Sequence, residues 1–289
     1  MRNVGFLLTL GVLVLGWAVV FPSPLKLVAT TSILGDVVRQ VAGEGAELHV
    51  LLPPDTDPHT FEPTPQEIAL ISQADLVFIC GAGLEAALVP FLSQAPRVVD
   101  LSQGLELRAF PDGRVDPHVW LSPLNVAVWA EGIAAALTEL DPGNAESYRT
   151  RAQAYREELE ALDAWIRTQV EEIPEERRVL VVDHLAFGYF CDRYGFRQLS
   201  ILPGFSTLAE PSARELAQLE GEIKSLSVPA IFVAHTTASP LVDQVARDTG
   251  VEVVRLYVGA LSGPDGPAPT YLELMRYDVS AIVAALGGG

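Results

Sequence analysis

Histidines are the residues of this chain whose type and placement point most directly to chemistry. The chain has five of them. His59 lies in a stretch rich in Pro and Asp, and His118 lies in the similar stretch DPHVWLSP. His184 and His235 each follow a run of aliphatic residues typical of a buried strand. Four histidines therefore stand at the ends of predicted strands or in the loops that follow such strands.

Neutral imidazole is the commonest metal ligand in proteins. A set of histidines without thiolates favours zinc and also suits copper or nickel, whereas an oxygen-rich set suits manganese or magnesium. Each of the four histidines taken alone is better explained as a polar loop residue, and no HExxH or CxxC pair fixes two ligands locally. A shared metal site therefore depends on a fold that brings them together. His49, inside a predicted strand, is interpreted as a structural residue.

Strand and helix patterns alternate along the chain after its first 24 residues. The predicted strands are 26–32, 46–52, 75–81, 97–101, 179–183, 197–202, 230–234 and 251–257. The predicted helices are 33–43, 64–74, 84–92, 123–140, 186–194, 212–226, 240–249 and 270–286. This alternation predicts parallel sheets covered by helices on both faces. Ligands bind beyond the carboxyl ends of the strands in such sheets, which is where the four histidines are expected.

A long amphipathic pattern separates the two alternating blocks. Its apolar residues recur every three or four positions, at Tyr148, Ala152, Tyr155, Leu159, Leu162, Ile166 and Val170. A helix of about 30 residues spans roughly 45 Å, which is more than the width of one small domain. The sequence therefore predicts an α/β protein with an N-terminal lobe (25–140), a connecting helix (141–172) and a C-terminal lobe (173–289), each lobe having its own parallel sheet.

The first residues predict export. Residues 4–21 are apolar and uncharged, and Arg2 precedes them. This pattern predicts that residues 1–24 form a signal peptide or an N-terminal membrane anchor. Either would place the remaining chain in the periplasm or at the extracellular face of the cytoplasmic membrane. No Cys follows the apolar run, so the sequence shows no lipoprotein attachment site.

The composition excludes several classes of protein. Hydrophobic residues make up 49% and charged residues 19% of the 289 residues, as in a globular chain with a sizeable core. The net charge of −18 provides no basic surface of the kind that nucleic-acid binding needs, so no nucleic-acid partner is expected. We expect a monomer. Cys80 and Cys191 fall in different predicted lobes and are expected to be buried free thiols.

Seven stretches of the chain form a recognisable set. They are VATTSI (28–33), DPHTFEPTP (57–65), ADLVFICGAGLE (74–85), DPHVWLSP (116–123), AFGYF (186–190), EPSARELAQLEGEIK (210–224) and TYLELMRYDVSAIV (270–283). Together they resemble the solute-binding proteins of zinc and manganese ABC importers, the ZnuA/TroA-like family. The resemblance covers essentially the whole exported part. It implies two α/β lobes joined by a rigid helix, with a metal ion in the cleft between the lobes.

The resemblance also implies a set of ligands. The first three ligand positions of the family fall on His59, His118 and His184. In this family a His at the third position usually accompanies zinc and a Glu usually accompanies manganese, so the resemblance favours the zinc branch. The acids Asp57, Asp116, Asp183 and Glu62 stand near the ligands in sequence. They are candidates to accept the second ring N–H of a ligand histidine.

The chain departs from the family pattern at two positions. The fourth family ligand is an Asp, and the matching residue here is Gly259, whereas the nearest acid is Asp265 in a loop rich in Gly and Pro. The chain also has Ala234 and His235 where the family usually carries a Glu. One hypothesis is that His235 replaces the missing Asp and completes a site of four histidines. The alternatives are that Asp265 or water is the fourth ligand and that His235 faces solvent or supports a ligand.

These observations predict a function and leave alternatives. The leading prediction is a high-affinity zinc-binding protein, not an enzyme, that captures Zn²⁺ outside the cytoplasm and delivers it to the membrane permease of a zinc ABC importer. One alternative is a zinc-dependent hydrolase or hydratase, because three histidines and an open position also describe catalytic zinc. The other is a manganese-binding homologue or an adhesin with the same fold. The sequence leaves open the physiological metal, its affinity, the identity of the importer and cleavage of the N-terminal segment.

Overall fold

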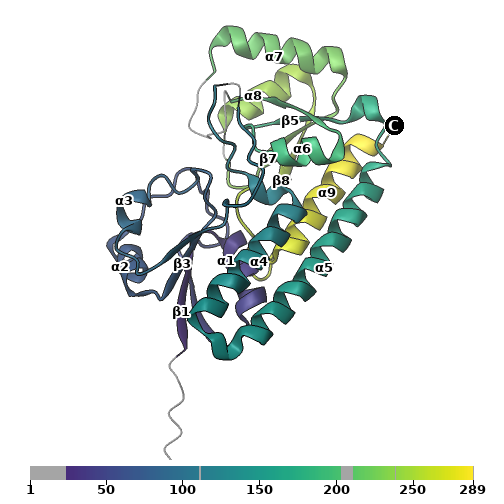
Figure 1. Cartoon of the computed structure of the whole chain (residues 1–289). Coiled ribbons are helices and arrows are strands. Elements are labelled where there is room, and N and C mark those ends of the chain that lie inside the picture. The colour runs from purple at the N-terminus through teal and green to yellow at the C-terminus, as the bar shows by residue number, and fades with distance from the viewer. Residues whose placement is uncertain (1–23, 111, 203–210, 238, 289) are drawn as a thin grey trace, which may run out of the picture.

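The structure is a computed structural model that describes residues 24–110, 112–202, 211–237 and 239–288. It consists of two α/β lobes set along a group of long helices (Figure 1). Each lobe has a four-stranded parallel sheet, and the strand orders β2-β1-β3-β4 and β6-β5-β7-β8 follow one pattern. The predicted fold class, with two α/β lobes and a long joining helix, is confirmed.

The elements of the N-terminal lobe are β1 (Leu25–Ala29), α1 (Ser32–Ala42), β2 (Ala46–Val50), α2 (Pro65–Gln73), β3 (Leu76–Ile79), α3 (Val89–Leu92) and β4 (Val98–Asp100). The C-terminal lobe contains β5 (Val179–Val182), α6 (Gly188–Tyr194), β6 (Arg197–Ser200), α7 (Ala213–Leu226), β7 (Ala230–Ala234), α8 (Pro240–Thr249) and β8 (Glu252–Leu256). Short 3₁₀ turns lie at Val119–Leu121 (η1), Pro142–Asn144 (η2) and Glu175–Arg177 (η3).

Side-chain caps fix where the helices near the cleft begin. The hydroxyl of Thr31 accepts the N–H of Leu34, so α1 begins at Ser32 and the predicted strand 26–32 ends early. Thr64 and Glu67 form a capping box at the start of α2. These caps bound the two loops that leave the carboxyl ends of β1 and β2, and the second of these loops carries His59.

Three long helices form a spine along both lobes (Figure 1). They are α4 (Pro123–Leu140), α5 (Ala145–Val170) and α9 (Tyr271–Gly287). Helix α5 has 26 residues and packs on α1, α4 and α9. All seven residues of its predicted apolar stripe are buried, which confirms that interpretation of the pattern. Asp163 lies on the same buried face and was not predicted there.

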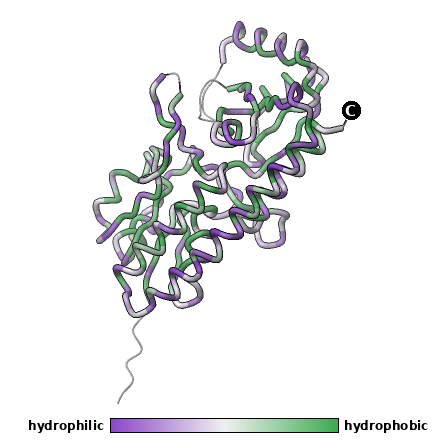
Figure 2. Tube along the Cα trace, turned by 45° about the vertical axis from the view of Figure 1, so that its right-hand side comes forward, coloured by the Kyte–Doolittle hydropathy of each residue, from purple (hydrophilic) through white to green (hydrophobic). Residues whose placement is uncertain are grey.

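One continuous hydrophobic cluster joins the two lobes through the spine. It includes Leu27 and Phe78 from the first sheet, Leu159 from α5, and Phe232 and Leu256 from the second sheet. The opposite face of each sheet packs into a smaller cluster of its own. Figure 2 shows hydrophobic segments inside the C-terminal lobe, whereas hydrophilic and hydrophobic segments alternate along its outer helices. Both sheets are therefore covered on both faces, and the lobes share a core.

Within the described residues no helix is both long and apolar enough to cross a membrane. The predicted signal peptide or anchor, residues 1–24, lies outside the described residues except for Pro24. Cys80 and Cys191 are both buried and free, as predicted.

Asp278 is a buried carboxyl group on α9. Its Oδ1 atom accepts the N–H of Tyr257 at 2.8 Å, and its Oδ2 atom has no hydrogen-bond partner among the described residues. Burial raises the pKa of Asp278 to about 8. Between roughly pH 4 and 8 the folded chain therefore binds more protons here than the unfolded chain, whose Asp pKa is about 3.9. The contribution of Asp278 to stability falls as the pH rises through that range.

We predict that D278N becomes more stable relative to the wild type as the pH rises from about 4.5 to 8. The variant keeps an acceptor for the N–H of Tyr257 but has no titrating group at this position. It therefore escapes the fall in the free energy of unfolding, up to about 1.4 kcal/mol per pH unit, that Asp278 causes in the wild type. Denaturant unfolding of both proteins at several pH values measures the difference in the free energy of unfolding. A difference that is the same at all pH values would contradict the raised pKa.

Candidate metal centre

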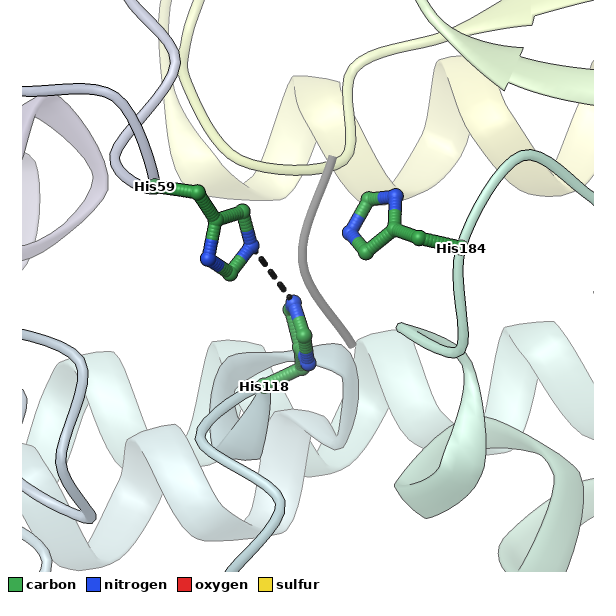
Figure 3. Close-up of side chains that lie close together, drawn as sticks. All are labelled: His59, His118 and His184. Atoms are coloured by element: carbon green, nitrogen blue, oxygen red, sulfur yellow. Dashed lines mark hydrogen bonds between the residues drawn. The ribbon is translucent and has the colours of Figure 1, made fainter. Parts of the chain in front are cut away.

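Three of the four predicted ligands converge on one point between the lobes. His59 lies in the loop between β2 and α2, His118 directly precedes η1, and His184 follows β5. One nitrogen of each ring lies within 4.8 Å of one nitrogen of each other ring, and the ring centroids are pairwise 5.2 Å apart. Figure 3 shows the three rings pointing toward one another. His118 and His184 are buried, and His59 is half-buried.

Short acidic turns place these histidines. In the tripeptides Asp57-Pro58-His59 and Asp116-Pro117-His118 the Asp carboxylate accepts the backbone N–H of the His two residues later, at 2.9 and 3.1 Å. Asp and Asn form such turns readily. Asp183 accepts the backbone N–H of His184 at 2.8 Å. All three ligands therefore follow an Asp that fixes their backbone.

Two of these carboxylates also orient the rings. Nδ1 of His118 lies 2.9 Å from Oδ1 of Asp116, and Nδ1 of His184 lies 2.9 Å from Oδ1 of Asp183. An ionised carboxylate only accepts, so Nδ1 of each neutral ring carries the proton and Nε2 carries the lone pair. Both Nε2 atoms belong to the cluster. Of the four acids named as candidates, Asp116 and Asp183 lie within hydrogen-bond distance of a histidine ring of this cluster.

The Nε2 atoms of His118 and His184 fit a metal ion. Nε2 of His184 is buried and has no hydrogen-bond partner among the described residues. Nε2 of His118 lies 3.1 Å from Nε2 of His59 (Figure 3). Buried polar atoms normally have partners, and a nitrogen lone pair left without one is a ligand position. Three nitrogen donors aimed at one point can bind a divalent cation.

The pKa values favour the metal-binding protonation states. Burial and the two neighbouring imidazoles lower the pKa of His59 to about 2. Burial lowers the pKa of His118, although its hydrogen bond to Asp116 opposes the shift. Burial would raise the pKa of Asp183, but interactions led by the hydrogen bond from His184 hold it below its ordinary value. Neutral imidazoles beside ionised carboxylates are what a divalent cation needs.

The space beside the rings is small. A cavity of about 10 Å³ is lined by the three histidines and by Asp57, Pro58, Ala234, Thr236, Val258 and Gly259. A cavity of about that volume holds roughly one water molecule. The space enclosed beside the rings therefore matches one small ligand such as water.

The structure does not bring His235 to the other three histidines. Nε2 of His235 lies 2.7 Å from Oδ1 of Asp55 in the loop before α2, and its ring lies against Tyr257 with centroids 4.0 Å apart. In this arrangement His235 links the lobes beside the site and does not complete a site of four histidines, contrary to that hypothesis. Asp265 is exposed and does not belong to the cluster of donor atoms.

Gly259 is closely opposed by Pro58. A Cβ atom at Gly259 would lie 2.9 Å from Cδ and 3.2 Å from Cγ of Pro58. The proline ring is fixed to the backbone and cannot rotate aside. Pro58 therefore occupies the space that a side chain at position 259 needs. No role was predicted for Pro58, although its place in the repeated Asp-Pro-His tripeptide is a signal that could have identified it.

Residues 27–285 match the family model described as zinc-uptake complex component A, periplasmic. The manganese-binding lipoprotein MntA of Halalkalibacterium halodurans is 34% identical over 267 residues, which cover 91% of this chain and 88% of that protein. The iron-binding protein YfeA of Yersinia pestis is 33% identical over 270 residues, which cover 91% of this chain and 86% of that protein.

The fold is also that of a solved structure. The periplasmic zinc-binding protein TroA from Treponema pallidum matches with a TM-score of 0.86 and 30% sequence identity, over 91% of this chain and 99% of that chain. These three relatives are named for three different metals. Similarity alone therefore leaves the choice of metal to the donor atoms of this site.

We predict that zinc binding resists mild acid. A protonated imidazole does not coordinate. If all three rings had an ordinary pKa near 6.5, protonation between pH 7 and 5 would weaken zinc binding about 25-fold for each ring and roughly 10,000-fold in all. The lowered pKa values of His59 and His118 keep both rings neutral further into acid, so the loss should be far smaller. Competition with a chelator at each pH measures it. A loss close to 10,000-fold by pH 5 would contradict these pKa shifts.

We also predict that a carboxylate side chain at position 259 is accommodated only if Pro58 shifts or is reduced, because its Cβ atom would lie 2.9 Å from Cδ of Pro58. G259D alone should lower the free energy of unfolding by about 1–3 kcal/mol, the usual cost of overpacking. P58A/G259D should recover much of that loss and should bind manganese more tightly than the wild type, because a carboxylate oxygen suits manganese. Thermal unfolding and manganese titration check both statements, with P58A as the control. A G259D protein as stable as the wild type would show that Pro58 does not exclude the side chain.

Proposed function

The chain belongs to the family of the periplasmic zinc-uptake component ZnuA, and on this premise we propose that it captures Zn²⁺ outside the cytoplasm and delivers it to the membrane permease of an ABC importer. Members of the family are metal-binding substrate-binding proteins of ABC importers, so the chain is a metal carrier. The expectation that it is not an enzyme is confirmed by this membership.

The observation that carries the assignment to zinc is the donor set. The three converging donors are all imidazole nitrogens, and Gly259 provides no carboxylate where the resemblance to the family implies one. Manganese prefers oxygen ligands, whereas zinc is bound readily by three histidines with a fourth position left over. Relatives are named for manganese and iron as well as zinc, so support for zinc comes from these residues and not from the family.

The arrangement suits capture better than catalysis. Two ligands come from the N-terminal lobe and one from the C-terminal lobe, so a bound ion is enclosed between them. The adjacent cavity of about 10 Å³ matches a single small ligand beside the three rings. The N-terminal apolar run would deliver the protein to the outer face of the membrane, where the permease is reached. The protein acts there as a monomer.

We predict that zinc binds much more tightly than manganese. H59A, H118A and H184A should each weaken zinc binding by more than roughly 100-fold, above the 10–100-fold loss typical when only an outer partner of a ligand is removed. Their folds should persist, because the rings line the cleft and do not belong to the hydrophobic cluster. Competitive titration with both metals measures the affinities.

H49A and H235A are the matched controls and should bind zinc like the wild type. His49 lies on β2 and pairs with Glu47, and His235 pairs with Asp55. Manganese binding equal to or tighter than zinc binding would overturn the zinc assignment. Absence of binding to any divalent metal would overturn the carrier function itself.

A further inference from the structure

Arg108 lies outside the cluster of three histidines and connects Asp116, which supports His118, to the C-terminal lobe. It belongs to the segment between β4 and η1 of the N-terminal lobe. Its Nη1 atom donates to Oδ2 of Asp116 at 3.0 Å, and its Nε atom donates to Oδ2 of Asp192 on α6 at 2.6 Å. The side chain of Asp116 is fully buried, whereas that of Asp192 is 64% exposed. One guanidinium therefore joins a buried carboxylate of one lobe to a surface carboxylate of the other.

The buried end of this bridge holds a ligand. Asp116 uses Oδ1 for the ring and backbone N–H groups of His118 and uses Oδ2 for Arg108. A carboxylate held through both oxygens cannot rotate about its Cβ–Cγ bond without breaking one of these contacts. The contact with Arg108 therefore fixes the plane of the carboxylate that orients His118.

Tyr189 on α6 supports the contact between Arg108 and Asp116 by binding the backbone of both residues through its hydroxyl group. Its hydroxyl accepts the N–H of Arg108 at 3.0 Å and donates to the carbonyl oxygen of Asp116 at 2.9 Å. The guanidinium lies 5.8 Å from the centre of the Tyr189 ring, within the range of a cation–π contact. Both ends of the segment from Arg108 to Asp116 are thus attached to α6.

The first residue of α6 leaves room for the bridge. A Cβ atom at Gly188 would lie 1.5 Å from Nη1 of Arg108 and 2.5 Å from Oδ2 of Asp116. Any side chain there would displace the guanidinium from the carboxylate. Gly188 is therefore required for Arg108 to reach Asp116.

Helix α6 is itself fixed to the spine. Asp163 on α5 accepts hydrogen bonds from Nη2 of Arg193 and from the hydroxyl of Tyr194, each at 2.7 Å. These residues directly follow Asp192 in α6. The position of Asp192 is therefore set by α5, which packs along both lobes.

We propose that Arg108 is a positioning residue that couples the contact between the lobes to the strength of metal binding, by holding Asp116 and through it His118. The proposal rests on the proposed function, because it assumes that His118 binds the cargo ion. Moving α6 away from the segment that holds Arg108 would free the Asp116 carboxylate and loosen His118. A partner that separates the lobes at this point would then promote release without touching a ligand.

The test compares R108M with R97Q in the full chain. Arg97, which directly precedes β4, forms an exposed ion pair with Glu139 on α4 and does not contact the three histidines. R97Q therefore controls for the loss of a charged pair. R108M should weaken Zn²⁺ binding about tenfold, the lower end of the range for outer partners of a ligand, and should raise the dissociation rate. The visible spectrum of the Co²⁺-loaded protein should also change, which a purely structural role would not produce. R97Q should match the wild type in all three measurements.

Two further variants test the link between the lobes. D192N leaves the contact between Arg108 and Asp116 intact and should weaken Zn²⁺ binding about two- to fivefold, as expected for an exposed ion pair. R108K keeps the charge but cannot bridge both carboxylates, so it should restore only part of the affinity lost in R108M. R108M/D192N should bind like R108M, because Asp192 acts only through Arg108.

The outcomes separate this proposal from the proposed function. If R108M and D192N bind Zn²⁺ and Co²⁺ like R97Q, the positioning role is overturned while the carrier function stands. If the losses in R108M and D192N add in the double variant, the coupling through Arg108 is overturned. If R108M does not fold, unchanged zinc dissociation in D192N and R108K overturns the proposal. If the wild type binds no divalent metal, the proposed function fails and this inference fails with it.

Discussion

The hydrogen bonds from the rings of His118 and His184 to buried carboxylates are the interactions on which the site depends. Each carboxylate also accepts the backbone N–H of its histidine, so ring and backbone are fixed together. The same contacts place the proton on Nδ1 and the lone pair on Nε2 of a neutral ring. A neutral and oriented imidazole in a buried position is a ligand that needs no rearrangement before it binds. The rest of the fold serves to bring Asp116 and Asp183, which belong to different lobes, to opposite sides of one point.

Hydrogen bonds and the shared hydrophobic cluster hold the two lobes together around this meeting point. The indole N–H of Trp120 donates to the carbonyl of Val258, and the hydroxyl of Tyr271 donates to the carbonyl of Trp120. Near the same place the N–H of Leu261 donates to the hydroxyl of Ser32. These contacts join residues far apart in sequence, and the shared hydrophobic cluster surrounds them. Wide opening of the lobes would expose that cluster, so the cleft is preformed and its ligands lose little conformational entropy when an ion binds.

Local patterns in the sequence were enough to predict the architecture and to single out the three histidines that the structure brings together. Alternating apolar segments predict parallel strands, and the stripe on α5 predicts which of its residues are buried, because both depend on periodicity alone. His59, His118 and His184 follow predicted strands or turns, and the topology then brings them together. His235 obeys the same rule but pairs with Asp55, 180 residues away. That pairing and the bridge from Arg108 to Asp192 depend on how side chains meet across lobes, which no local period encodes.

Gly259 stands where the resemblance to the family implies an Asp, and the absence of a carboxylate at this position changes the charge that would surround a bound ion. If three neutral imidazoles bind a divalent cation, none of these directly bound ligands compensates its charge. Asp116 and Asp183 compensate it from one hydrogen bond away, but Asp116 is also paired with Arg108, which withdraws part of its charge from the site. An ion that depends on direct contact with anionic oxygen, such as manganese, gains little here. Under the proposed function the expected cargo is therefore an ion that bonds strongly to nitrogen and accepts one small fourth ligand, and Pro58 lies in the space that a side chain at position 259 would need.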